Sequence, residues 1–110
     1  KDGVYNLGKA SLLTAAMITG NRELLKYACK DKIHQPYRKN LVPCFDEITN
    51  KANSLGALGS FLSGAGPTII AVLDSDDNKF EKAMIDFLST IDSSWPLKIT
   101  QASNTGVEII

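Results

Sequence analysis

The hydrophobic pattern changes its period once along the chain, close to Gly56, and this change limits the folds that the sequence can adopt. Before Gly56 the apolar residues recur every three or four positions, which is typical of amphipathic helices. After it come two apolar runs, residues 57–62 and 68–73, and the second run is rich in β-branched residues. The segment Ser63-Gly64-Ala65-Gly66-Pro67 separates them. This arrangement predicts two strands joined by a glycine-rich loop.

Apolar spacing predicts helices from Asp2 to Ile18 and from about Pro43 to Leu55. Between them it predicts a second, shorter helix that begins after Asn21 and carries Leu24, Leu25 and Ala28. A further helix is the clearest of all, because its apolar residues recur at every third or fourth position: they are Phe80, Ala83, Met84, Phe87, Leu88 and Ile91. In the first helix the expected apolar stripe is Val4, Leu7, Ser11 and Ile18, with Leu12 and Ala15 beside it.

Short polar residues and glycines mark the expected helix ends. Asp2 and Asn21 are placed to cap the first two helices, and the polar turn at residues 74–78 offers a cap to the last. Gly20 and Gly56 are placed to end the first and third helices.

Strands are also predicted near the C-terminus. Residues 97–101 alternate between apolar and polar, and a turn at residues 104–106 leads into an apolar stretch at residues 107–110. Helices followed by adjacent strands indicate an α+β fold with an antiparallel sheet. The part from the third helix to Gln101 has the order of a ferredoxin-like α/β plait that lacks its first strand. The earlier helices are extra N-terminal elements.

Composition excludes several classes of protein. The 110 residues carry 12 Lys and Arg against 12 Asp and Glu, so no basic excess points to a nucleic acid partner. The longest apolar run, residues 69–73, is far shorter than the roughly 20 residues of a membrane span. Cys29 and Cys44 form neither a disulfide framework nor a metal knuckle. We expect one domain with a single core, in the cytoplasm.

The glycine-rich loop is the first candidate site. Two glycines one residue apart let the backbone turn sharply and expose successive N–H groups as a nest for an anion. The hydroxyl groups of Ser63 and Thr68 are further donors. The loop is neither a Walker loop nor a dinucleotide fingerprint, because the residues that those motifs require are missing. A tight β-hairpin that uses glycine only for its turn explains the same residues.

The second candidate site is His34-Gln35-Pro36-Tyr37-Arg38, which we expect to be a loop. Pro36 stiffens the backbone, and Arg38 suits bidentate binding of a carboxylate or a phosphate. A surface connector with a solvated Arg38 is the alternative. His34 has no metal-ligating residue at suitable spacing, which favours a hydrogen-bonded structural role.

No metal site is predicted. Asp74, Asp76 and Asp77 lack the glycine and the terminal glutamate of a calcium loop, so capping of the next helix is the simpler interpretation. Cys29 and Cys44 are expected to be structural thiols.

Order and spacing together are more specific than any single motif. Residues 55–68, Leu-Gly-Ala-Leu-Gly-Ser-Phe-Leu-Ser-Gly-Ala-Gly-Pro-Thr, closely resemble the third motif of the GHMP small-molecule kinases. The segment at residues 34–38, followed by Leu-Val-Pro-Cys-Phe-Asp at residues 41–46, is similar to the homoserine kinase branch of that superfamily. The resemblance extends over nearly the whole chain. Its main departure is Cys44, where the family usually has glycine.

The resemblance implies transfer of the γ-phosphoryl group of ATP to the hydroxyl group of L-homoserine, a step of threonine biosynthesis. It places Arg38 against the homoserine carboxylate, with His34 in the same substrate site. It also places Ser63, Gly64, Ala65, Gly66 and Thr68 in the phosphate region. No catalytic residue and no metal ligand is implied within this chain.

The resemblance further implies that residues 1–110 are a single C-terminal domain without its N-terminal ATP-binding domain. That absent domain carries the phosphate loop and the ligand for Mg²⁺, so we expect no cofactor on this chain and no turnover by it alone. The face toward the N-terminal domain is expected to be exposed and partly apolar, which promotes self-association such as a homodimer.

Other functions fit parts of the sequence. An amino-acid-binding regulatory module of ferredoxin-like fold predicts binding of an amino acid without ATP. A purely structural or dimerisation domain predicts binding of neither ligand. A GHMP kinase that acts on another small molecule is a narrower alternative.

Overall fold

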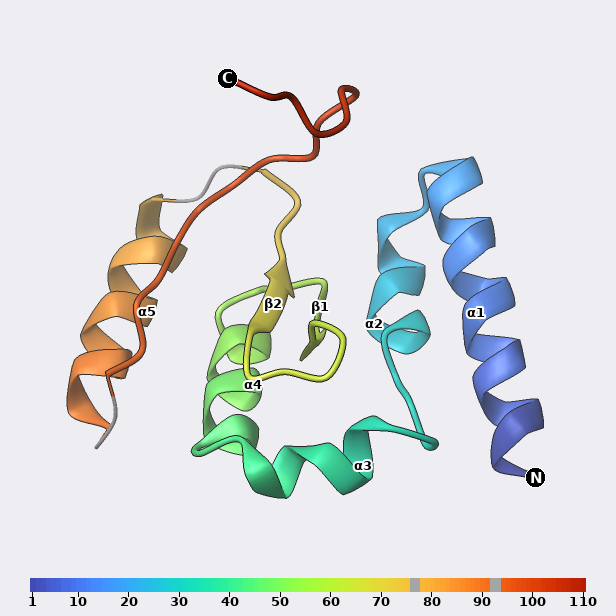
Figure 1. Cartoon of the computed structure of the whole chain (residues 1–110), viewed down its shortest axis with the longest axis horizontal. Coiled ribbons are helices and arrows are strands. Elements are labelled where there is room, and N and C mark those ends of the chain that lie inside the picture. Colours follow the sequence, from blue (N-terminus) through green and yellow to red (C-terminus); the bar gives the residue numbers. More distant parts are fainter. Residues whose placement is uncertain (76–77, 92–93) are drawn as a thin grey trace.

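A two-stranded antiparallel sheet lies at the centre of the computed structural model, which describes residues 1–75, 78–91 and 94–110. Strand β1 (Gly59–Leu62) pairs with β2 (Ile69–Val72), so that Gly59 lies opposite Val72 and Leu62 opposite Ile69. The glycine-rich segment connects the two strands, as the change of period predicts. Helix α4 contacts both strands and α2 contacts β1 (Figure 1).

The N-terminal region is a pair of packed helices. Helix α1 (Asp2–Thr19) ends at Gly20, whose φ of 69° places it in the left-handed region. A 3₁₀ turn, η1 (Arg22–Leu24), leads into the short helix α2 (Leu25–Ala28), and both pack against α1. The positions of these helices are confirmed, and Gly20 ends α1 as predicted.

The predicted caps of these two helices are confirmed in position for one of them: Asn21 occupies the N-cap position of η1, whereas Asp2 does not occupy that of α1. Neither α1 nor η1 has a side-chain capping hydrogen bond, and Lys1 occupies the N-cap position of α1. Asp2 is itself the first helical residue, where its negative charge favours the positive end of the helix dipole instead.

Most of the apolar stripe predicted for α1 is not buried. Val4 is 75% exposed, Leu7 68% and Ile18 80%. The helix instead turns Ala16, which is buried, toward the rest of the chain, with Leu12 and Ala15 half-buried. The stripe is therefore an exposed apolar face of α1.

The segment predicted to be a second loop contains a short helix. Helix α3 (Gln35–Arg38) continues into the 3₁₀ turn η2 (Lys39–Leu41). Pro36 lies in the first turn of α3, where its missing N–H leaves no helical hydrogen bond unmade and its fixed φ suits the helix. The prediction of a loop was wrong because it considered only that proline stiffens the backbone, whereas proline is also favoured in the first turn of a helix.

Helix α4 (Phe45–Ser54) follows directly and buries Phe45, Ile48, Thr49 and Ala52. Its N-cap residue, Cys44, has a φ of 60°. A residue with a side chain is disfavoured in this left-handed region by roughly 1–2 kcal/mol, which glycine avoids. Cys44 therefore holds a turn that a glycine would adopt without this cost.

Helix α5 (Asn78–Thr90) buries Phe80, Met84 and Leu88, as its spacing predicts. These side chains form the main core with Ile48 and Ala52 of α4 and with Ala57. A second cluster, made of Val42, Phe45 and Leu62, lies at the base of the glycine-rich loop.

Of the aspartates proposed to cap α5, Asp76 and Asp77 lie outside the described residues. The α+β fold with an antiparallel sheet is confirmed.

The C-terminal strands are not formed. After α5 the described residues contain no strand, and residues 107–110 lie in an exposed segment. Trp95 and Leu97 pack against the core cluster, and the segment that carries them runs back along α5 (Figure 1). Within residues 97–101 only Leu97 is half-buried, and Ile99 is 41% exposed, so the alternation in the sequence does not correspond to a buried face.

Among the described residues, no helix is long and apolar enough to cross a membrane.

Replacing Gly59 should test the packing of α2 on β1. A Cβ at Gly59 would lie 2.8 Å from Cys29 Sγ and 3.3 Å from the Leu25 carbonyl oxygen. That carbonyl belongs to the backbone and cannot rotate away, so Gly59→Ala should lower the free energy of unfolding by about 1–3 kcal/mol. The measurement is chemical denaturation of the chain.

Gly8→Ala is the matched control, because a Cβ at Gly8 meets nothing within 4 Å. This change in α1 should leave the stability unchanged or raise it by up to about 1 kcal/mol. Equal stability of Gly59→Ala and the unmodified chain would contradict the described packing.

Candidate functional site

The glycine-rich loop, residues 63–68, closes by two hydrogen bonds of its own backbone. Ser63 N donates to the Thr68 carbonyl oxygen at 2.9 Å, and Gly66 N donates to the Ser63 carbonyl oxygen at 3.0 Å. Gly64 and Gly66 have φ values of 57° and 78°, which only glycine adopts without strain. The turn itself therefore favours glycine at both positions.

The loop leaves part of its hydrogen-bonding capacity free for a ligand. Within the described part of the chain, the N–H groups of Gly64 and Ala65 and the hydroxyl groups of Ser63 and Thr68 have no partner. These four residues are exposed. Two adjacent amides with two nearby hydroxyls suit an anion such as a phosphate. The amides of Ser63 and Gly66 serve the turn, so they are not part of such a nest.

Arg38 and His34 lie at opposite ends of α3. Arg38 is the last residue of the helix, is exposed, and makes no ion pair with any described residue. His34 occupies the N-cap position, where its carbonyl oxygen accepts the backbone N–H of Arg38 at 3.1 Å. The guanidinium group is thus available to an anionic ligand, whereas the visible role of His34 lies in its backbone.

Side chains join α3 to the glycine-rich loop. Leu62, the residue before the loop, donates its backbone N–H to Gln35 Oε1 at 3.1 Å. Val42, just after η2, packs with Leu62, and a Cβ at Gly66 would lie 3.4 Å from Val42 Cγ2. The two segments singled out in the sequence therefore meet at their bases, with Arg38 and the free loop amides both exposed.

The carboxylate of Asp31 organises the start of α3. Its Oδ1 accepts the backbone N–H of Ile33 at 2.9 Å and its Oδ2 accepts that of His34 at 3.0 Å. It also accepts the backbone N–H of Gln35 and the side-chain amide of Asn6. These bonds satisfy backbone donors that a helix start leaves without partners.

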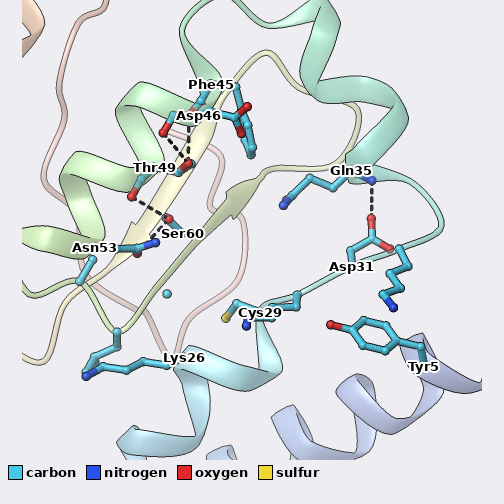
Figure 2. A pocket seen from close by; sticks show the side chains of 15 residues that line it. Tyr5, Lys26, Cys29, Asp31, Gln35, Phe45, Asp46, Thr49, Asn53 and Ser60 are labelled. Atoms are coloured by element: carbon cyan, nitrogen blue, oxygen red, sulfur yellow. Dashed lines mark hydrogen bonds between the residues drawn. The ribbon is translucent and has the colours of Figure 1, made fainter. Parts of the chain in front are cut away.

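Asn6, which belongs to α1, connects Asp31 and Lys32 to that helix. Its Oδ1 accepts the backbone N–H of Lys32 at 2.9 Å while its amide group donates to Asp31. The Lys32 ammonium group also lies 4.2 Å from the centre of the Tyr5 ring, a cation–π contact. Figure 2 shows Tyr5 beside Asp31, with Gln35 above them and its side chain directed away from Asp31. The residues before α3 are thus bound to α1.

These hydrogen bonds change the acidity of Asp31. Burial raises the pKa of its carboxyl group, but the donors from Asn6, Gln35, Ile33 and His34 outweigh this effect and lower the pKa to about 2. Each of them stabilises the ionised form. Asp31 is therefore a structural anion at neutral pH.

Two cavities meet at Asp31 and Gln35, which line both of them together with Cys29 and Lys30. One cavity of about 570 Å³ lies between the α2 region and α4 with β1 (Figure 2). The other, of about 470 Å³, has mainly apolar walls that include Leu13, Met17, Phe61 and Leu62, and His34 also lines it. Burial raises the pKa of the Cys29 thiol, which keeps it protonated and unreactive.

Metal-ligating side chains are not clustered among the described residues. No group of three or more His, Cys, Asp or Glu side chains lies close enough among them to hold a metal ion. Asp31 is occupied by its hydrogen bonds, and Asp46 pairs with Lys39 at 3.1 Å.

Asp31 and Gln35 were missed as site residues in the sequence. Gln35 belongs to the second candidate segment but has no predicted role, and Asp31 lies just outside that segment. A usable signal was present: an aspartate shortly before a proline in a first helical turn is a helix-start pattern. The bond from Gln35 to Leu62 had no such signal, because it joins residues 27 positions apart.

Comparison with known proteins identifies the class. Residues 12–89 match the family described as GHMP kinases C terminal. Since this match covers most of the described fold, the chain belongs to the GHMP kinase family, and it carries the C-terminal part of the family's fold.

The similar proteins within that family share one name. Over the whole chain it is 46% identical to the homoserine kinase of Clostridium beijerinckii, of which it covers 37%. It is 48% identical over 99% of its length to that of Caldicellulosiruptor saccharolyticus, of which it covers 36%. The crystal structure of the homoserine kinase from Cytophaga hutchinsonii superposes with a TM-score of 0.76, at 31% identity, over 83% of this chain and 30% of that one. The chain thus spans about a third of the length of these relatives.

The depressed pKa of Asp31 predicts a loss of stability in acid. A carboxylate whose pKa is lower in the folded state stabilises that state above its unfolded pKa of about 3.9, and loses this effect as the pH falls toward about 2. The free energy of unfolding should therefore decline between about pH 4 and pH 2, and Asp31→Asn should remove that part of the decline. Denaturant titrations at a series of pH values measure it.

Asp86→Asn is the matched control, because Asp86 is exposed on α5 and its carboxylate makes no hydrogen bond or ion pair with a described residue. It should leave the pH profile as it is. The same profile for Asp31→Asn and the unmodified chain would show that Asp31 does not organise the start of α3.

Proposed function

We propose that this chain is the C-terminal, substrate-side part of a homoserine kinase, which transfers the γ-phosphoryl group of ATP to the hydroxyl group of L-homoserine. The observation that carries the proposal is the similarity over the whole chain to proteins of that one name, at 46% and 48% identity. We place the reaction in the cytoplasm, where ATP is available, as a step of threonine biosynthesis.

Arg38 is the residue that we assign to the substrate. Its guanidinium group is exposed and has no ion-pair partner among the described residues, so it is free to form two parallel hydrogen bonds to the homoserine carboxylate. The helix that carries it is fixed at its start by Asp31. A guanidinium group held in this way orients the substrate as well as attracting it, which a lysine at the same position does less well.

The glycine-rich loop is assigned to the phosphate region. The free N–H groups of Gly64 and Ala65 are suited to the charge on a transferred phosphoryl group, and the hydroxyl groups of Ser63 and Thr68 add further donors. Phosphoryl transfer depends on positioning and on neutralising charge more than on covalent chemistry, so fixed amides are a useful contribution.

The rest of the active site lies, in this proposal, in the part of the enzyme that precedes the chain. The described residues offer no set of ligands for Mg²⁺, and the chain covers only 36–37% of the length of its relatives. An N-terminal domain would bind ATP and Mg²⁺. It or a second copy of the enzyme would also cover the exposed apolar face of α1.

Replacing Arg38 tests its assignment. In the full-length enzyme Arg38→Ala should raise KM for homoserine about 10–100-fold, because it removes a charge-assisted hydrogen-bonding pair, and should leave KM for ATP nearly unchanged. Steady-state kinetics with each substrate varied in turn measure both constants.

The control is Arg22→Ala, which removes the other arginine of the chain, one that pairs with Asp74 away from α3. It should leave both constants unchanged. Unaltered KM for homoserine in Arg38→Ala would reject Arg38 as the carboxylate-binding residue.

Expression of the chain alone tests the division of the site. Residues 1–110 should not form phosphohomoserine from homoserine and ATP, whereas the full-length enzyme should. The coding sequence upstream of Lys1 should contain the phosphate loop Pro-x-x-x-Gly-Leu-Gly-Ser-Ser-Ala. Turnover by the isolated chain would contradict the division. Binding of homoserine by the chain without ATP, with no such loop upstream, would favour an amino-acid-binding module instead.

A further inference from the structure

We propose that Gln35 is a positioning residue, whose side chain sets the placement of Arg38 relative to the glycine-rich loop by binding the backbone of Leu62. The inference rests on the proposed function and adds a residue to it. Gln35 is not assigned to contact homoserine or ATP.

The backbone N–H of Leu62 points away from β2, the strand with which β1 pairs. In an antiparallel pair, successive N–H groups point alternately toward the partner strand and away from it. Ser63 N donates across the pair to Thr68, so the preceding N–H, that of Leu62, points to the other edge of β1. There it meets Gln35 Oε1 at 3.1 Å. The bond is thus made by a side chain from outside the sheet.

The backbone N–H of Leu62 also lies in a buried part of the chain. Leu62 is only 7% exposed and packs with Val42 and Phe45, so its N–H has little access to water. A buried donor without an acceptor is costly, and this cost keeps Gln35 at the strand edge.

Gln35 is hydrogen-bonded through both its backbone and its side chain. Its backbone N–H donates to Asp31, and its side chain accepts from Leu62 (Figure 2 shows the first of these bonds). Gln35 is the first residue of α3 and Arg38 is the last. A single helical turn therefore separates Arg38 from a residue that is attached both to Asp31 and to the strand that ends where the loop begins.

Gln35 therefore links Arg38 to the glycine-rich loop through one helical turn and one hydrogen bond. A displacement of Leu62 moves the loop at its first residue, and the same displacement moves α3 through Gln35. Since small errors in the placement of reacting groups cost large factors in rate, this bond should affect catalysis as well as stability.

The test uses the full-length enzyme with the variants Gln35→Met and Gln35→Glu. Methionine keeps the length of the side chain but lacks the acceptor, whereas glutamate keeps an acceptor oxygen. Gln35→Met should lower kcat/KM for homoserine about 10-fold or more, through both a higher KM and a lower kcat. Gln35→Glu should stay within about threefold of the wild type. Activities are normalised to the folded fraction by circular dichroism.

Asn53→Met is the matched control, because Asn53 is another amide side chain on a wall of the neighbouring cavity, and its Oδ1 accepts the Ser60 hydroxyl group at 3.0 Å. It should leave kcat and KM unchanged. Where Gln35→Met does not fold, Gln35→Asn replaces it, since the shorter amide cannot reach Leu62. It has the same expected result.

The outcomes separate the two proposals. A wild-type enzyme that does not phosphorylate homoserine defeats the proposed function. An active wild type whose folded Gln35→Met variant keeps both constants overturns the positioning role. So does a failure of both Gln35→Met and Gln35→Asn to fold, since the bond would then serve folding alone.

Discussion

One carboxylate with four hydrogen-bond donors is the interaction on which the rest of the site depends. Asp31 accepts the side chain of Asn6 on α1 and three successive backbone N–H groups that lead into α3. Helix α3 has four residues, too few to form a stable helix in water by itself. The bonds at Asp31, together with Pro36 in the first turn, make its start favourable. Without them the exposed Arg38 would be carried by a flexible connector.

The site also depends on how the small sheet is supported. Its two strands have open edges, and one buried N–H on the edge of β1 is satisfied by Gln35. Beneath the glycine-rich loop, Val42, Phe45 and Leu62 form an apolar cluster that links the start of α4 to the strand. The loop is therefore a firm turn, and the residues whose amides are free, Gly64 and Ala65, are exposed. Apolar packing and hydrogen bonds thus both hold the glycine-rich loop in this conformation.

Regular periodicity made much of the fold predictable. Phe80, Met84 and Leu88 are spaced four apart and are buried on α5, and the glycine-rich segment marks the hairpin. Where prediction was wrong, the deciding contacts were not local. The stripe of α1 that includes Val4 and Leu7 is exposed because the described chain offers nothing to cover it, and residues 97–101 alternate without a strand to pair with. In the site, the roles of Arg38 and the loop come from resemblance and stay predictions. Gln35 was missed because its partner, Leu62, lies far along the chain.

The most direct measurement is a crystal structure of the full-length enzyme with L-homoserine and a non-hydrolysable ATP analogue. In that complex the Arg38 guanidinium group should contact the homoserine carboxylate, and the amides of Gly64 and Ala65 should face the phosphate region. The hydrogen bond from Leu62 N to Gln35 should be retained. A homoserine carboxylate bound elsewhere, with the glycine-rich loop turned away from the nucleotide, would contradict it.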